Sequence, residues 1–94
     1  MRGNGGIMTY DLKQFIKFKP QILCRANREV EKIKRYYPNV TTIHKSKGLE
    51  YDYVILIDFE TNGVPEEEAI KYVAITRAKN GIVITGLKSL LSAL

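Results

Sequence analysis

The sequence predicts an α/β domain built on a small, largely parallel sheet with helices on its faces. Three observations indicate this class. Residues 53–57 are almost continuously apolar, as is typical of a strand covered on both faces. Segments with helical and strand character follow one another in the order αβαββαβα, and most of the connections between them are short. The length of 94 residues allows only one domain.

Four short segments rich in β-branched and apolar residues predict the strands. Each is bounded by turn-forming residues such as Lys19-Pro20, Pro38-Asn39 or Asn62-Gly63. The predicted strands are residues 21–25, 40–44, 53–57 and 81–85.

Helical periodicity predicts helices at residues 10–18 and 28–37 and a short apolar one at the end of the chain, 87–94. Either Thr9 or Asp11 is a candidate N-cap for the first helix. Asn27 is a candidate N-cap for the second, because its side-chain oxygen can accept an unpaired amide of the first turn.

The clearest helical signal spans residues 65–79. Three glutamates, at positions 66–68, fill its first turn, and Arg77 and Lys79 are predicted in its last turn. Asn80-Gly81 follows directly, which suits a glycine C-cap. This charge order complements the helix dipole.

The net charge of +5 is unevenly distributed. Residues 1–48 contain eleven Lys and Arg against three Asp and Glu, whereas residues 49–94 contain four against seven. The basic half indicates either a polyanion on one side of the fold or a charge that serves solubility alone. Composition does not separate these two interpretations.

Two further features bound the class of protein. No apolar run approaches the roughly 18–20 residues of a membrane span, and the single cysteine, Cys24, has no partner for an internal disulfide, so a cytoplasmic protein is expected. The glycine-rich residues 1–8 are interpreted as a flexible leader and residues 9–94 as the folded domain.

Polar segments follow three of the predicted strands, at residues 25–27, 44–48 and 58–60. Because ligands of open parallel sheets gather at the carboxyl ends of the strands, these segments are expected to line one rim. The first two are basic and polar, which suits phosphate groups. The 44–48 segment is interpreted either as a phosphate-binding loop or as a solvated turn at Gly48.

Several polar residues, on these segments and on the predicted helix 65–79, each have two possible interpretations. Arg77 has the chemistry to contact a transferring phosphoryl group, or it serves as a cation at a helix end. His44 contacts a phosphate or base, or it is a satisfied residue at a strand end. Asp58 and Glu60 follow an apolar strand as Mg²⁺ ligands do in nucleotide hydrolases, but no Gly-Lys-Ser/Thr occurs in the chain, so no metal site is expected.

Two segments resemble motifs of a known family. Thr-Ile-His-Lys-Ser-Lys-Gly-Leu-Glu-Tyr at 42–51, followed by an apolar strand, is similar to motif V of superfamily 1 DNA helicases of the UvrD/Rep/PcrA type. Tyr-Val-Ala-Ile-Thr-Arg-Ala-Lys at 72–79 resembles their motif VI, in the same order along the chain. Ile-Leu-Cys-Arg-Ala-Asn at 22–27 is similar to motif IVa. The resemblance covers about residues 20–86.

The resemblance implies a minimal RecA-like second motor domain (2A). Arg77 would be an arginine finger on the γ-phosphate of ATP, Glu50 would bind the ribose, and Gly48 would let the loop come close. Five residues would contact single-stranded DNA: Arg25, Asn27, Thr42, His44 and Lys45.

Departures from the family pattern indicate half a catalytic site. The phosphate loop, the Mg²⁺-binding Asp-Glu motif and an Asn-Tyr-Arg-Ser-like segment are missing, as is the usual large insertion between motifs IVa and V. The link between motifs V and VI is compressed to residues 62–65. ATP with Mg²⁺ is therefore expected to be held mainly by a P-loop-bearing first motor domain, in the full-length protein or in trans, and the chain alone is not expected to hydrolyse ATP.

A non-enzymatic DNA- or protein-binding module that keeps this fold is the alternative. A self-sufficient nucleotide hydrolase is disfavoured because the phosphate loop is absent.

Overall fold

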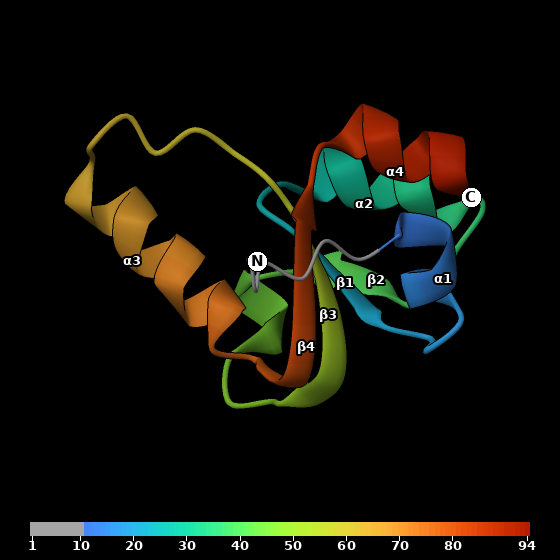
Figure 1. Cartoon of the computed structure of the whole chain (residues 1–94). Helices are drawn as coiled ribbons and strands as arrows, with labels where there is room; N and C mark the ends of the chain where they lie inside the picture. The colour runs from blue at the N-terminus through green and yellow to red at the C-terminus, as the bar shows by residue number, and fades with distance from the viewer. Residues whose placement is uncertain (1–10) are drawn as a thin grey trace, which may run out of the picture.

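The computed structural model describes residues 11–94, in which four parallel strands form one sheet in the order β2-β1-β3-β4 (Figure 1). The strands are β1 (Gln21–Cys24), β2 (Val40–Thr42), β3 (Tyr51–Ile57) and β4 (Ala78–Thr85). The helices are α1 (Leu12–Ile16), α2 (Asn27–Lys34), α3 (Pro65–Ile75) and α4 (Leu87–Ala93), with a 3₁₀ helix, η1 (His44–Ser46). The α/β class and the parallel sheet are confirmed. The predicted leader lies outside the described residues.

Strand β3 is central and carries the two cores of the domain on its two faces. Its side chains alternate, so that Ile55 and Ile57 join one cluster of buried residues while Val54 and Leu56 join the other. All four are at most 1% exposed, which confirms the interpretation of this apolar run as a strand covered on both sides.

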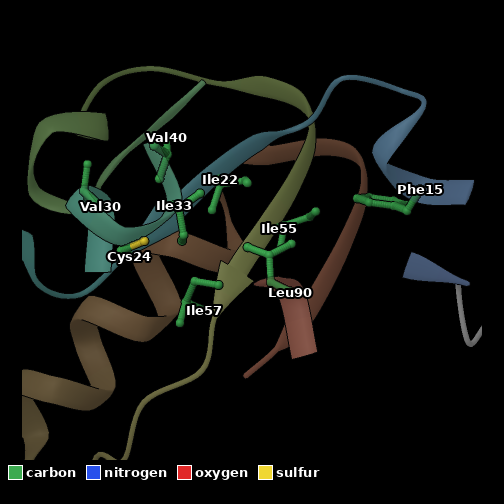
Figure 2. Packing of buried hydrophobic residues seen from close by; sticks show 9 residues of the cluster. All are labelled: Phe15, Ile22, Cys24, Val30, Ile33, Val40, Ile55, Ile57 and Leu90. Atoms are coloured by element: carbon green, nitrogen blue, oxygen red, sulfur yellow. The ribbon is translucent and has the colours of Figure 1, made fainter. Parts of the chain in front are cut away.

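Helices α1, α2 and α4 cover one face of the sheet, and α3 lies on the other with η1 (Figure 1). Figure 2 shows the first core, where Phe15, Val30, Ile33 and Leu90 from the helices meet strand residues, among them Ile55. The second core is smaller and joins strand residues to Ile43 and to Ala74 of α3. Ala74 is the buried residue of α3, and the partly buried Ile70 and Val73 of the same helix pack against this core.

The end of α3 differs from the prediction. The helix stops at Ile75, and β4 begins at Ala78, so Arg77 is not in a last helical turn and Lys79 belongs to a strand. Pairing with β3 outweighs the helical pattern here, because Tyr51 lies opposite Ala78 and its N–H donates to the Arg77 carbonyl at 2.8 Å. The predicted C-cap at Asn80-Gly81 is therefore wrong. A register shift between Tyr51 and Tyr53 accommodates an extra residue in β4 at this point.

Smaller corrections concern the other element ends. Asp11 is confirmed as the N-cap of α1, since its Oδ1 accepts the Lys13 N–H at 3.0 Å. Asn27 is not a cap but the first residue of α2, and the Ala26 N–H donates to Glu29 Oε1 at 3.1 Å instead. Strand β2 ends at Thr42, because the chain turns into η1 before His44.

Cys24 lies in the first core and is completely buried, which raises the pKa of its thiol to about 12 (Figure 2). Because the thiolate is the reactive form, we expect a thiol reagent at pH 8 to modify the native protein only on unfolding. The check is the rate of labelling with and without urea. Fast labelling of the native protein would contradict the buried position of this strand.

Candidate functional site

The loop between η1 and β3 brings the chain back from the carboxyl edge of the sheet to its amino edge. Gly48 adopts a φ of +80°, a conformation that side-chain-bearing residues rarely adopt. The Leu49 N–H donates to the Ser46 carbonyl at 3.0 Å, and Ser46 itself is buried, with its hydroxyl donating to the Ile43 carbonyl at 2.6 Å. These contacts define the course of the loop up to Glu50.

Arg77 is bound to this same loop. Its Nη1 donates to the Leu49 carbonyl at 3.3 Å, and its Nη2 donates to Thr76 Oγ1 at 3.4 Å. Its Nε is buried and has no hydrogen-bond partner among residues 11–94. A buried N–H without a partner costs free energy, so this arrangement of the guanidinium is not its most favourable one and a movement of the side chain would relieve the cost.

Glu50 lies next to Arg77 because the pairing of Tyr51 with Ala78 places the residues preceding these two strands side by side. The Glu50 side chain is exposed and borders a cavity of about 380 Å³ at the amino edge of the sheet. The cavity is also lined by Asp52, Tyr53 and Lys79. Glu50 and Arg77, predicted from different motifs, thus have neighbouring backbones at one edge of the sheet, although Arg77 does not line this cavity.

The residues predicted to contact DNA lie at the opposite, carboxyl edge. Arg25 directly follows β1, and Asn27 is exposed at the start of α2. Thr42 ends β2, and its Oγ1 accepts the Lys45 N–H at 3.3 Å, which helps to shape η1. His44 and Lys45 are exposed on η1.

The prediction of a single rim is therefore partly wrong. Arg25, η1 and Asp58 do follow the carboxyl ends of their strands. Gly48 instead lies in the loop that leads away to the amino edge, where β3 begins two residues earlier than predicted. A connection between two parallel strands has to return to the amino edge, and Gly48 lies on this return path because the next strand begins at Tyr51.

Arg25 forms a bidentate ion pair with Glu67 of α3. Its Nε donates to Glu67 Oε1 and its Nη2 to Oε2, each at 2.8 Å. The hydrogen bonds from Arg25 lower the pKa of the Glu67 carboxyl group. Sequence reasoning treated Glu67 only as one of three dipole-stabilising glutamates. Nothing local distinguishes it from Glu66 and Glu68, because its partner lies 42 residues away.

Asp58 is paired with Lys71, whose Nζ lies 2.7 Å from Asp58 Oδ1. The hydrogen bond from Lys71 lowers the pKa of Asp58. Lys71 also donates to the Phe59 carbonyl at 3.3 Å, so this pair fastens α3 to the end of β3. Across residues 11–94 no group of three or more His, Cys, Asp or Glu side chains is arranged to hold a metal ion.

An all-parallel sheet with helices on both faces defines an α/β fold, and this one is consistent with the RecA-like class. The chain belongs to the UvrD-like helicase C-terminal domain family, whose sequence model matches residues 6–89. This match is wider than the range in which the three motifs are recognised. In the described part of the chain, no helix is long and apolar enough to cross a bilayer.

Individual relatives match over a shorter range. The chain is 38% identical over 64 residues to the probable DNA helicase II homolog of Rickettsia conorii and, with the same identity, to the DNA helicase II of Rickettsia typhi. Each alignment covers 53% of this chain and 10% of the relative. The chain thus matches about a tenth of the length of these curated proteins.

Proposed function

We propose that this chain supplies the C-terminal motor half of an ATP-dependent DNA helicase. The observation that carries the proposal is the hydrogen bond from Arg77 to the loop before β3, which holds its guanidinium at the amino edge of the sheet, where the exposed Glu50 also lies. Membership of the UvrD-like C-terminal domain family and relatives named DNA helicase II support it. A cytoplasmic location accords with this function.

The residues at the amino edge fit one side of a bound nucleotide. Arg77 offers donors for a γ-phosphate, and Glu50 offers acceptors for a ribose hydroxyl. At Gly48 the missing side chain lets a ligand approach the backbone. The chain has no phosphate-loop lysine, so ATP with Mg²⁺ would be held mainly by a P-loop-bearing partner domain. When bound, ATP supplies the phosphoryl group that is transferred to water.

The part of this chain in that reaction is electrostatic. The Arg77 guanidinium stabilises the negative charge that builds up on the phosphoryl oxygens as the bond to the leaving group breaks. For this it must give up the hydrogen bond to the Leu49 carbonyl, which costs little free energy because at 3.3 Å that bond is weak. Glu50 orients the nucleotide without taking part in proton transfer.

The carboxyl edge would hold single-stranded DNA. The cations and polar groups there come from two neighbouring strands and the helices after them. Asn27, His44 and Lys45 are exposed, whereas Arg25 and Thr42 are half-buried. Because the two proposed sites lie at opposite edges of one sheet, strand β3 and helix α3 both run between them. A rigid connection of this kind suits a motor that couples nucleotide closure to movement of DNA.

A non-enzymatic binding module is the second candidate function. The missing arginine of the Asn-Tyr-Arg-Ser-like segment favours it. The two functions differ in whether Arg77 matters, since a pure binder does not need an arginine finger.

The DNA face is tested by a salt titration of fluorescent single-stranded DNA binding. We expect weak binding. The logarithm of the association constant should fall linearly with the logarithm of the salt concentration, with a slope of about −0.7 for each phosphate neutralised. The double variant Arg25→Ala/His44→Ala is expected to lose most of this binding and to flatten the slope. A Lys88→Ala variant on α4 serves as a control for general charge. Binding that is insensitive to salt would contradict the basic edge as the contact surface.

A further inference from the structure

The Arg25–Glu67 ion pair occupies one of the two parallel pairs of N–H groups with which a guanidinium can bind phosphate. Glu67 takes up the Nε and Nη2 side of the guanidinium with both carboxylate oxygens, each hydrogen bond measuring 2.8 Å. A phosphate presents two oxygens with the same spacing and uses the same parallel pair of N–H groups. Phosphate and Glu67 therefore compete for one position.

A phosphate could instead bind the remaining N–H groups of Arg25, but Glu67 weakens that contact as well. These N–H groups point away from Glu67, but the carboxylate in contact with the guanidinium offsets its positive charge and repels an approaching anion. Because the hydrogen bonds from Arg25 lower the pKa of Glu67, its carboxylate stays ionised at neutral pH and continues to repel the phosphate. Arg25 is thus a weak phosphate contact for as long as the pair is intact.

The pair is open enough to be displaced. The Arg25 side chain is 39% exposed and that of Glu67 28% exposed, so an incoming strand can reach both. Ion pairs in such partly hydrated positions are usually weak, equivalent to about a fivefold change in affinity at most. A buried pair would instead resist exchange.

We propose that Glu67 is an internal competitor of single-stranded DNA, which occupies the phosphate-binding fork of Arg25 and lowers the affinity of the carboxyl edge for nucleic acid. This inference rests on the proposed function, since it assumes that Arg25 contacts DNA phosphates. It assigns to Glu67 a role in setting affinity, distinct from those of its two neighbours.

The chain offers matched controls for this proposal. Glu66 and Glu68 lie on the same turn of α3 and carry the same charge, but neither contacts Arg25: Glu68 accepts the Thr61 hydroxyl, and Glu66 is exposed. Each glutamate-to-glutamine change removes one negative charge from the same surface. A general charge effect is therefore common to all three variants, whereas release of Arg25 occurs only in Glu67→Gln.

The experiment measures binding of a fluorescent oligothymidylate to the full 94-residue chain at one fixed salt concentration. We expect Glu67→Gln to bind about two- to fivefold more tightly than either Glu66→Gln or Glu68→Gln. Glu67→Asp keeps the charge but shortens the side chain, and it is expected to show part of this gain. In an Arg25→Ala background, Glu67→Gln is expected to give no more gain than the controls.

The possible outcomes separate the inference from the function on which it rests. If wild type binds DNA and Glu67→Gln equals the controls, or if its gain persists without Arg25, competition by Glu67 is overturned and the DNA face stands. If no variant binds DNA, both are overturned. A urea titration of each variant identifies any that is unfolded, and Glu67→Asp then provides the decisive comparison.

Discussion

Replacing Arg77 with alanine is expected to lower ATP turnover by about 10³–10⁵-fold in a motor that contains this chain and a P-loop-bearing partner domain. The reason is that the guanidinium would be the donor from this half of the site to the developing charge on the phosphoryl group. Its contacts with the Leu49 carbonyl at 3.3 Å and with Thr76 Oγ1 at 3.4 Å are weak, so the guanidinium loses little free energy when it turns toward that charge. The measurement is steady-state ATP hydrolysis in the presence of single-stranded DNA.

Two further variants test whether the loss of ATP turnover is specific to the guanidinium of Arg77. Arg77→Lys keeps the charge but not the planar fork, so it is expected to recover only a small part of the rate. Lys88→Ala removes an exposed cation on α4 that does not line the amino-edge cavity, and it is expected to change turnover little. Unchanged turnover in Arg77→Ala would favour the non-enzymatic module, and DNA binding by the same variant would show whether that module is intact.

Replacing Leu56 with alanine is expected to destabilise the domain by about 2–5 kcal/mol. Leu56 is fully buried in the second core, on the central strand, and packs among Leu23, Ile43 and Ala74. Removal of its side chain leaves a cavity that the surrounding strands cannot close. A domain of this size has a total stability of only about 5–15 kcal/mol, so the variant should be partly unfolded at moderate temperature.

The measurement is urea denaturation followed by circular dichroism. Ile84→Ala is the matched control, because Ile84 is 44% exposed on the edge strand β4 and its truncation is expected to cost less than about 1 kcal/mol. Equal losses in the two variants would contradict the placement of β3 at the centre of the sheet.

The sheet was predictable from the sequence because its signals are local. An uninterrupted apolar run at 53–57 requires cover on both faces, and short connections limit how neighbouring strands can be joined. Element ends were less predictable. The helical pattern of α3 continues as far as Lys79, but hydrogen bonds to β3 stabilise an extended chain from Ala78 onward.

The candidate site divides in the same way. The three motifs are recognisable from the sequence alone, and they identify Arg25, His44, Glu50 and Arg77 as candidate site residues. Their distribution over two edges of the sheet is not recognisable, because it follows from where β3 begins and how the loop at Gly48 returns. The partner of Arg25 is equally hidden, since three consecutive glutamates are alike in sequence.

The sequence by itself determined the class of fold, the parallel order of elements and the family to which the chain belongs. These depend on apolar periodicity and on short motifs, both of which are properties of neighbouring residues. Only the tertiary structure decided that Arg77 and Glu50 meet at the amino edge and that Arg25 is held by Glu67. These residues are separated by 27 and 42 positions in the chain, and they are neighbours only because of strand pairing and helix packing. The local sequence pattern does not predict such long-range neighbours.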